Sequence, residues 1–416
     1  MRWMMPFIAA CFLIAAASTA MAEENCRVCH RVATSGIHAA LACKDCHGND
    51  GTTTPDPASA AHKAKGCTSC HNGYGRLFDH AMATRTREKQ FVKKTFAKAD
   101  PHFFDRNCQS CHLRGCTDCH GGSGHSLAQA RDRNCFACHR GYFVGSEYYG
   151  MAPREDSLRY QRGETAYGET FLKMLPDVHA EAGIACSSCH TMQSLIAGAR
   201  TAKGCLDCHK PSKKVLEHRI KGHLERMECY ACHSAWGAQE YGTFYLRFTD
   251  SPSQQDYRLK TVNGNYVKSA YLKKQDAPPL GVNARGMVTP IRPQFIAYFS
   301  DIRNDMVVGE ENRLLTASWK AFFPHTVRRG TVMCDGCHDA PRRFIMEGKE
   351  DRIYRLQDDG MKLPSFWDRT GQKVMNGDFL SPARYRAMTE KNAAYQRAYV
   401  EKWKKLTDRV ENSSLP

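Results

Sequence analysis

The sequence Cys-x-x-Cys-His occurs ten times in this chain, and this repetition limits what the chain can fold into. The copies begin at Cys26, Cys43, Cys67, Cys108, Cys116, Cys135, Cys186, Cys205, Cys229 and Cys334. This motif is the attachment signature of c-type haem, in which both thiols form thioethers with the porphyrin and the histidine ligates the iron. Only three residues separate the motif at Cys108 from the one at Cys116, so we expect two haems almost in contact there.

All cysteines but one belong to these motifs, since 20 of the 21 lie in them and Cys11 lies in the leader. A lone Cys-x-x-Cys is also typical of half a zinc site or of a redox pair. Ten copies, each followed directly by histidine, favour neither. We therefore expect ten covalent haems, with thioethers at Cys26, Cys29, Cys43, Cys46, Cys67, Cys70, Cys108, Cys111, Cys116, Cys119, Cys135, Cys138, Cys186, Cys189, Cys205, Cys208, Cys229, Cys232, Cys334 and Cys337.

The histidines predict how the irons are ligated. Ten of the 19 complete a motif and are expected as proximal ligands: His30, His47, His71, His112, His120, His139, His190, His209, His233 and His338. Nine remain as candidate distal ligands: His38, His62, His80, His102, His125, His179, His218, His223 and His325. Six of these nine lie five to nine residues before a motif, a spacing that suits ligands of a nearby haem. Two histidines on one iron leave no position for a substrate and favour electron transfer.

Ten haems against nine candidates leave at least one haem without a distal histidine from this chain. Methionine, lysine, water or a histidine of another protomer would complete it. An open position would be a catalytic site, and the haem of the tenth motif is our preferred candidate for it.

The first residues have the form of a secretory signal peptide. Arg2 gives a positive start, residues 6–17 are apolar, and residues 20–22 form a small-x-small cleavage site. We expect cleavage after Ala22 and export to the periplasm, with the outer cell surface as the alternative. No other stretch reaches the run of about 18 apolar residues that a membrane span needs, so we expect none in the mature chain.

Composition and length bear on the core and on partners. The net charge of +16 is of a kind that often accompanies nucleic acid or anionic membranes. Haem propionates supply much of the opposite charge here, so we expect no nucleic-acid partner. The first nine motifs occur at roughly one per 23 residues, which is too few residues for an ordinary apolar core. We therefore expect a haem-cored fold with short α-helices and irregular loops.

The motif spacing divides the chain into six parts. After a signal peptide (1–22) we expect a six-haem region (23–150), a three-haem region (151–240), a small β-rich insert (241–324), the tenth haem (325–345) and a helical tail (346–416). The insert contains neither cysteine nor histidine. Its Asn263-Gly264 pair predicts a hairpin between residues 257–262 and 265–272. Further strands are expected at 294–299, 306–308 and 313–315, the last two separated by a Gly-Glu-Glu-Asn turn.

Three helices are predicted outside the motifs. Residues 82–99 are basic and end at Asp100-Pro101, and residues 157–174 are expected as a helix broken at Gly163 and Gly168. A long C-terminal helix is expected to start at Ser381-Pro382, an N-cap followed by proline in the first turn. Its apolar face has 3 to 4 spacing: Tyr385, Met388, Tyr395, Tyr399, Leu406 and Val410.

The array of ten motifs, the doublet at 108–120 and the leader resemble the multihaem c-type cytochromes of anaerobically respiring, metal- and oxyanion-reducing bacteria. Residues 148–153 (Tyr-Tyr-Gly-Met-Ala-Pro) and Val178-His179 before Cys186 are similar to parts of the octahaem tetrathionate reductase group. The resemblance covers about residues 26–338 and implies a decahaem cytochrome c fold. This chain has ten motifs rather than eight, and it lacks the Cys-x-x-Cys-Lys motif of pentahaem nitrite reductases.

Three functions remain open on this basis. The first is an electron carrier of anaerobic or extracellular respiration, with closely packed and mostly bis-histidine haems. Its partners would be redox proteins, such as a quinol-oxidising cytochrome or other multihaem cytochromes, and an oligomer is compatible with it. The second is a terminal reductase of a small oxyanion or of a nitrogen or sulfur compound at one open haem. The third is a structural polymer in which a histidine of another protomer completes the ligand count.

Overall fold

The structure is a computed structural model, and it describes residues 35–36, 38–42, 45, 67–108, 112–113, 115–120, 126–139, 162–166, 169–172, 177–197, 202–256, 260–263, 265–330, 333–348, 369 and 371–412. The predicted signal peptide, the cysteines and histidines of the first two motifs, Cys111, His62 and His125 lie outside these residues. Within them, no helix has the length and apolar character needed to cross a membrane.

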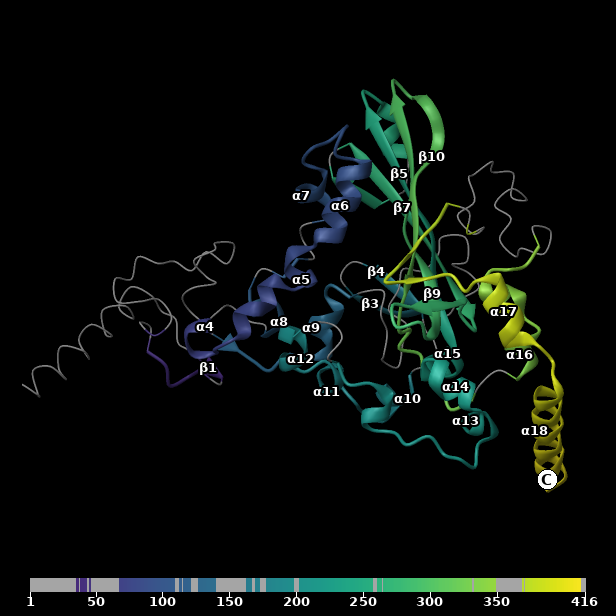
Figure 1. Ribbon diagram of the computed structural model, residues 1–416. Coiled ribbons are helices and arrows are strands. Elements are labelled where there is room, and N and C mark those ends of the chain that lie inside the picture. The colour runs from purple at the N-terminus through teal and green to yellow at the C-terminus, as the bar shows by residue number, and fades with distance from the viewer. Residues whose placement is uncertain are drawn as a thin grey trace, which may run out of the picture. The chain divides into compact units, whose positions relative to one another are not determined.

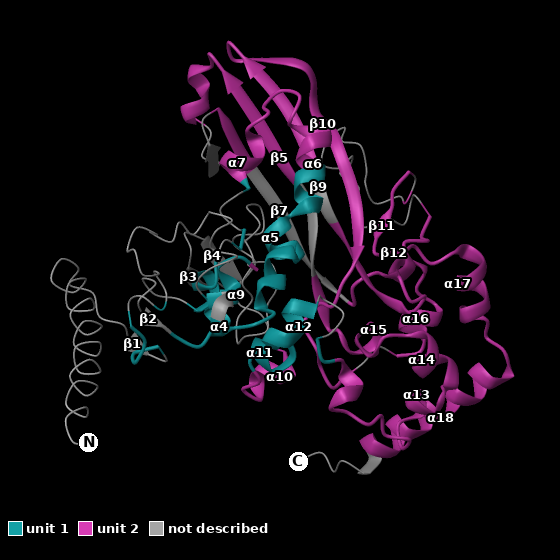
Figure 2. Cartoon of the chain, turned by 60° about the vertical axis from the view of Figure 1, so that its left-hand side comes forward, with its two compact units in different colours: residues 1–90, 108–138, 185–203 teal, residues 91–107, 139–184, 204–416 magenta. Residues whose placement is uncertain are grey.

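The chain forms two compact units, each assembled from several segments (Figure 2). The first consists of residues 1–90, 108–138 and 185–203, and the second of 91–107, 139–184 and 204–416. Helix α6 (Thr86–Thr95) runs across one of these boundaries.

The first unit is a set of short helices around haem motifs. Its elements are β1 (Ser35–Gly36), α4 (Cys67–Cys70), η1 (Tyr74–Asp79), α5 (Ala81–Thr84), α8 (Thr117–His120), β2 (Ser126–Leu127), α9 (Asp132–Phe136), α11 (Cys186–Cys189) and α12 (Met192–Ala197). Among its described residues, the buried apolar side chains are those of Leu77 and Phe78. Two buried side chains make a very small apolar core for the described part of this unit.

The second unit carries a mixed sheet with short helices around it (Figure 1). Its helices are α7 (Phe103–Asn107), α10 (Val178–Glu181), η4 (Cys205–Asp207), α13 (Leu216–Arg219), α14 (Lys221–Arg226), α15 (Cys229–His233), η5 (Pro252–Asp256), α16 (Asp335–His338), η6 (Pro341–Phe344), α17 (Pro382–Thr389) and α18 (Ala393–Asn412). Its strands are β3 (Arg162–Ala166), β4 (Glu169–Leu172), β5 (Trp236–Thr249), β6 (Lys260–Asn263), β7 (Tyr266–Asp276), β8 (Leu280–Asn283), β9 (Val288–Arg303), β10 (Met306–Ala321), β11 (Val374–Met375) and β12 (Gly377–Asp378).

The sheet contains the predicted insert but is larger than expected. Strands follow the order β11-β10-β9-β5-β7-β6, while β8 pairs with β9 and β12. The pairs β5–β9 and β10–β11 are parallel and the others antiparallel. The predicted hairpin is present as β6 and β7. The sheet also includes β5 from residue 236 onward and two short strands from the tail that was expected to be helical.

The Gly-Glu-Glu-Asn segment was expected to separate two strands, but it lies within a single strand. Strand β10 runs through it, and the ladder to β9 shifts between Val308 and Arg313. The chain reverses earlier, at the pair Arg303–Met306, where Asn304 and Asp305 have φ of 47° and 59°. Because asparagine and aspartate tolerate the left-handed region, they supply the hairpin turn, and the four-residue segment is accommodated as a bulge.

Of the three helix predictions, one is wrong, and each of the other two corresponds to a pair of shorter helices. Residues 162–166 and 169–172 form the paired strands β3 and β4 rather than a helix, since the two glycines that were taken as breaks disfavour helix throughout so short a segment. The helix at 82–99 divides into α5 and α6 at Arg85, which has φ of 49°. The C-terminal helix is two helices, α17 and α18, and the predicted N-cap is confirmed, since Ser381 Oγ accepts a hydrogen bond from Arg384 N at 3.2 Å.

Buried side chains of the second unit hold this sheet together. One cluster joins β9 and β10 to the tail, with Trp319, Tyr298 and Ile291 fully buried beside Val374 and Phe379. The indole Nε1 of Trp319 donates to Gln372 Oε1 at 2.6 Å, which satisfies its polar atom. A second cluster packs Leu280, Val288, Phe344 and Leu380 around Ala231 of the ninth motif. The sheet therefore forms a platform directly against that motif.

We predict that the haem-free chain keeps only this platform. A haem-free product should be digested rapidly by protease across the motif segments. A fragment containing residues 236–321, with 341–347 and 371–389 still attached, should persist because its apolar core is polypeptide. Mass spectrometry of the digest provides the measurement. A uniformly protected chain would contradict the prediction and mean that the motif segments fold without porphyrin.

A second prediction concerns the pairing of β8 with β12. A Cβ atom at Gly377 would lie 2.1 Å from the carbonyl oxygen of Val282, so alanine there forces the backbones apart. Gly377→Ala should lower the free energy of unfolding by about 1–3 kcal/mol, a typical penalty for overpacking. Gly330→Ala is the matched control, since nothing lies within 4 Å of its added methyl group. Equal denaturation midpoints for the two variants would argue against the close approach.

Candidate haem-binding site

Six of the seven fully described motifs fold as about one helical turn, and the seventh, which begins at Cys135, starts at the end of α9. In such a turn, residues i, i+3 and i+4 lie on one face, so the two cysteines and the histidine point toward the same side. The backbone closes the turn by a hydrogen bond from the histidine N–H to the carbonyl of the first cysteine. Its length is 2.8 Å at His71, 3.0 Å at His120, 2.9 Å at His190, 2.9 Å at His209 and 2.8 Å at His338.

The motifs lie in pairs, and the pairing does not follow the sequence. Three pairs of thiols lie within hydrogen-bonding reach of each other: Cys67 with Cys116, Cys135 with Cys186, and Cys205 with Cys229. In the thiol form, the contact with Cys186 lowers the pKa of Cys135 to about 7, and the same contact raises the pKa of Cys186. Neighbouring attachment sulfurs imply neighbouring porphyrin edges, so each unit brings haem sites from separate motifs side by side.

Four candidate distal histidines lie near a motif histidine at similar ring separations. The ring centroids are 6.0 Å apart for His38 and His71, 5.9 Å for His179 and His209, 6.2 Å for His218 and His233, and 6.2 Å for His223 and His338. The four spacings agree within 0.3 Å although the pairs come from different parts of the chain.

This spacing fits an iron between the two rings. An imidazole–metal bond is about 2.0–2.1 Å long and the ring centroid lies about 1.1–1.2 Å behind the nitrogen, so two rings opposed on one ion are about 6.3 Å apart. Burial lowers the pKa of His223 and of His338, as it does that of His190, and this favours the neutral imidazole that metals require. The residues of this chain therefore fit bis-histidine haem.

The chain between His218 and His223 explains how two close residues serve different motifs. They lie on separate short helices, α13 and α14, divided at Ile220, whose ψ of 106° is extended rather than helical. This break directs one ring to the ninth motif and the other to the tenth.

Three of the ligand candidates have a hydrogen-bond acceptor beside Nδ1. His120 bonds the Ala128 carbonyl at 3.0 Å, His233 the Arg328 carbonyl at 3.1 Å, and His179 the Asp177 carboxylate at 2.8 Å. An acceptor at Nδ1 holds the proton there and leaves the lone pair on Nε2, which is the tautomer that ligates a metal.

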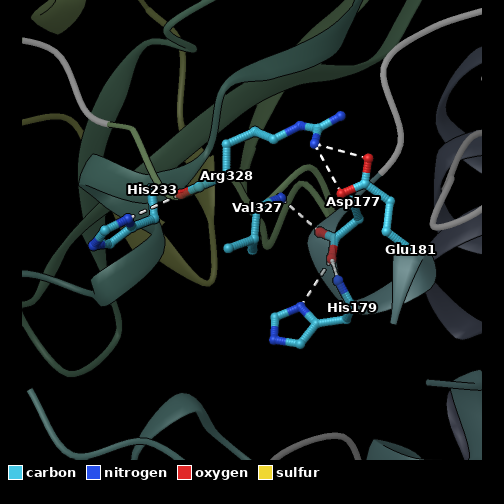
Figure 3. A network of polar contacts seen from close by, with 6 residues as sticks. All are labelled: Asp177, His179, Glu181, His233, Val327 and Arg328. Atoms are coloured by element: carbon cyan, nitrogen blue, oxygen red, sulfur yellow. Dashed lines mark hydrogen bonds and ion pairs between the residues drawn. The ribbon is translucent and has the colours of Figure 1, made fainter. Parts of the chain in front are cut away.

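The His179 and His233 hydrogen bonds meet on one short segment, Val327–Arg328 (Figure 3). Oδ2 of Asp177 accepts from Val327 N at 2.5 Å, and Oδ1 accepts from the backbone and the ring of His179 at 2.8 Å. Arg328 N donates to the His233 carbonyl at 2.9 Å, and its guanidinium pairs with Glu181 at 3.1 Å. The segment that follows β10 thus holds a candidate ligand of the eighth-motif haem, His179, and one of the ninth-motif haem, His233.

A buried arginine lies between the ninth and tenth motifs. Arg343 is 7% exposed, and its guanidinium donates to the Ala231 carbonyl at 3.1 Å and to Cys337 Sγ at 3.0 Å. Among the described residues no carboxylate forms an ion pair with it. Nearby, burial raises the pKa of the Cys232 thiol to about 12.

For three other candidates the structure shows different contacts. The Nδ1 atom of His80 caps α5 by accepting from Met82 N at 3.2 Å, which places the proton on Nε2 and does not suit ligation. His102 donates its backbone N–H to Asp100, and the ring of His325 lies 4.4 Å from Phe323. The pair His223–His338 also argues against our preferred open haem, because it supplies the tenth motif with a second imidazole.

Sequence reasoning missed Asp177 and Arg343. Asp177 carried a signal, since aspartate is a preferred N-cap residue whose side chain reaches nearby N–H groups, and Asp177 directly precedes Val178-His179. Arg343 carried none, because nothing in its spacing distinguishes it from the other basic residues.

Comparison with known families gives one match. Residues 178–243 match the cytochrome c3 family. The stretch contains motifs seven to nine together with His179, His218 and His223. The match supports a multihaem c-type cytochrome with covalently bound haems. Searches of curated proteins and of solved structures find no match.

We predict that His218→Ala and His223→Ala each expose a different iron. Each variant should gain one high-spin ferric signal in electron paramagnetic resonance, because one haem loses its second imidazole. His80→Asn is the matched control: asparagine keeps the cap, and the variant should add no high-spin signal. A histidine-to-alanine variant whose spectrum stays unchanged would show that its ring pair is not a ligand pair.

Proposed function

We propose that this chain is an exported decahaem cytochrome that carries electrons along closely packed, mostly bis-histidine haems in anaerobic or extracellular respiration. The observation that carries the proposal is the set of four imidazole pairs at 5.9–6.2 Å. Paired imidazoles fill both axial positions of an iron and so leave no place for a substrate. A chain with several such sites is suited to moving electrons rather than transforming a compound.

The paired motifs support the same function. Bound haem supplies one-electron redox chemistry at each site, and this chain supplies the spacing. The contacts Cys67–Cys116, Cys135–Cys186 and Cys205–Cys229 bring attachment sulfurs of different motifs together. Within the second unit, Arg343 joins the ninth motif to the tenth, so motifs eight, nine and ten form a continuous series.

The proposed surroundings follow from the sequence. The leader-like residues 1–22 support export to the periplasm, with the outer surface as the alternative. The proposed partners are redox proteins, including a quinol-oxidising cytochrome or other multihaem cytochromes. The net charge of +16 is offset by the propionates of ten haems and supports no nucleic-acid partner.

The first test is the haem count. The intact mature protein should have the mass of its polypeptide plus ten haems, as measured by denaturing mass spectrometry. A polypeptide mass without covalent haem would remove the basis of the proposal, and fewer than ten would identify motifs that are not used.

A second test decides between a carrier and a terminal reductase. Oxidised protein should give a paramagnetic resonance spectrum dominated by low-spin iron, because four or more haems have two imidazoles. A strong high-spin signal that shifts with added oxyanion would instead favour an open, substrate-binding haem.

A further inference from the structure

The buried charges of the second unit are placed unequally around two neighbouring haem sites. The eighth-motif haem is the one that Cys205 attaches and that His209 and His179 would ligate. The ninth-motif haem is the one that Cys229 attaches and that His233 and His218 would ligate. The thiols of Cys205 and Cys229 lie within hydrogen-bonding reach, so these sites are immediate neighbours.

An anionic carboxylate holds the ligand ring on one side of this junction. Asp177 is buried, and its three hydrogen bonds come from the backbone N–H of His179, the Nδ1 of the same ring and the N–H of Val327. Both backbone partners are donors, and a ligating ring also donates from Nδ1, so none is left to accept a proton from the carboxyl group. The carboxylate is therefore the form that satisfies this site.

On the other side of the junction the corresponding acceptor is neutral. The Nδ1 of His233 faces the carbonyl of Arg328 at 3.1 Å, a weaker acceptor than a carboxylate. A buried cation also lies beside the ninth motif, since Arg343 donates to the Ala231 carbonyl from a position that is 7% exposed.

We propose that Asp177 and Arg343 set a step in reduction potential between these sites, with the eighth-motif haem lower than the ninth. A charge-assisted hydrogen bond at Nδ1 gives the imidazole more electron-donating character and stabilises the ferric form. A buried guanidinium opposes the positive charge of the ferric form and favours the reduced one. One electron shared by the two sites therefore resides on the ninth, with the eighth iron ferric and the ninth ferrous. This inference rests on the proposed ligand pairs.

The first experiment removes one charge at a time and measures the potential of each haem by spectroscopic redox titration of the holoprotein. Asp177→Asn should raise the reduction potential of the eighth-motif haem by at least about 59 mV, which for one electron corresponds to a tenfold change in equilibrium constant. Glu181→Gln is the matched control, because Glu181 also carries a carboxylate near this segment but pairs with Arg328 and not with a ligand ring. Equal shifts in the two variants, or no shift, would overturn the proposal.

The second experiment changes the buried cation, Arg343. Arg343→Gln should lower the ninth-motif potential, whereas Arg343→Lys, which keeps a positive charge, should shift it much less. A purely structural role predicts that both substitutions act alike, and that result would remove Arg343 from the proposal.

The third arm needs no substitution of the buried charges. The low-spin signal that disappears in His179→Ala identifies the eighth-motif haem, and the one that disappears in His218→Ala identifies the ninth. In the unaltered protein the first signal should titrate at a lower potential than the second, and the reverse order or equal potentials would overturn the step. If His179→Ala produces no high-spin iron, the ligand pair itself fails, which is an outcome distinct from equal potentials.

Discussion

The proposed ligation depends on one spacing, the separation of about 6 Å between the centroids of paired imidazole rings, which matches two metal–nitrogen bonds in line plus the distance from each nitrogen to its ring centroid. The motif fixes one imidazole of each pair to the same turn as the attachment cysteines. The second imidazole comes from elsewhere in the sequence, so each pair joins two segments that would otherwise have little reason to meet. For segments with few buried apolar side chains, we propose that such joints are the main source of order.

The sheet provides what the motif segments do not, which is a core made of polypeptide. It contacts the last motifs at defined points: Ala231 is enclosed by its apolar cluster, and Glu228 N donates to the Val288 carbonyl at 2.9 Å. The segment after β10 then carries Thr326 to Arg328 past the ninth motif. Because this segment leaves the sheet, the Arg328 carbonyl that it offers to His233 and the Val327 N–H that it offers to Asp177 are held by the polypeptide itself, as second-shell groups of metal sites are.

The sequence predicted what local chemistry encodes and missed what tertiary packing decides. Attachment cysteines and motif histidines are recognisable because the reaction needs them within five consecutive residues. The motif histidine that pairs with each distal histidine was not predictable, because only a backbone break at Ile220 directs His218 and His223 to different motifs. Strand β9 was recognised only from residue 294, because Pro290 and Pro293 disfavour a strand interior. The structure accommodates Pro293 where β9 changes neighbours: its register with β8 ends at Pro290 and that with β5 begins at Ala297.

Buried charge next to a redox site is costly, and its placement therefore carries information. Asp177 and Arg343 each contact only a few polar groups, and replacing such buried groups by apolar ones is often neutral or favourable for stability. Stability alone thus gives little reason for an anion on one side of the junction and a cation on the other. A difference in reduction potential between the two haems does give a reason. An anion beside one haem lowers its potential and a cation beside the other raises its potential, so both charges widen the same difference. The uneven distribution is the physical reason to regard the sites of motifs eight and nine as an ordered pair rather than as two equivalent sites.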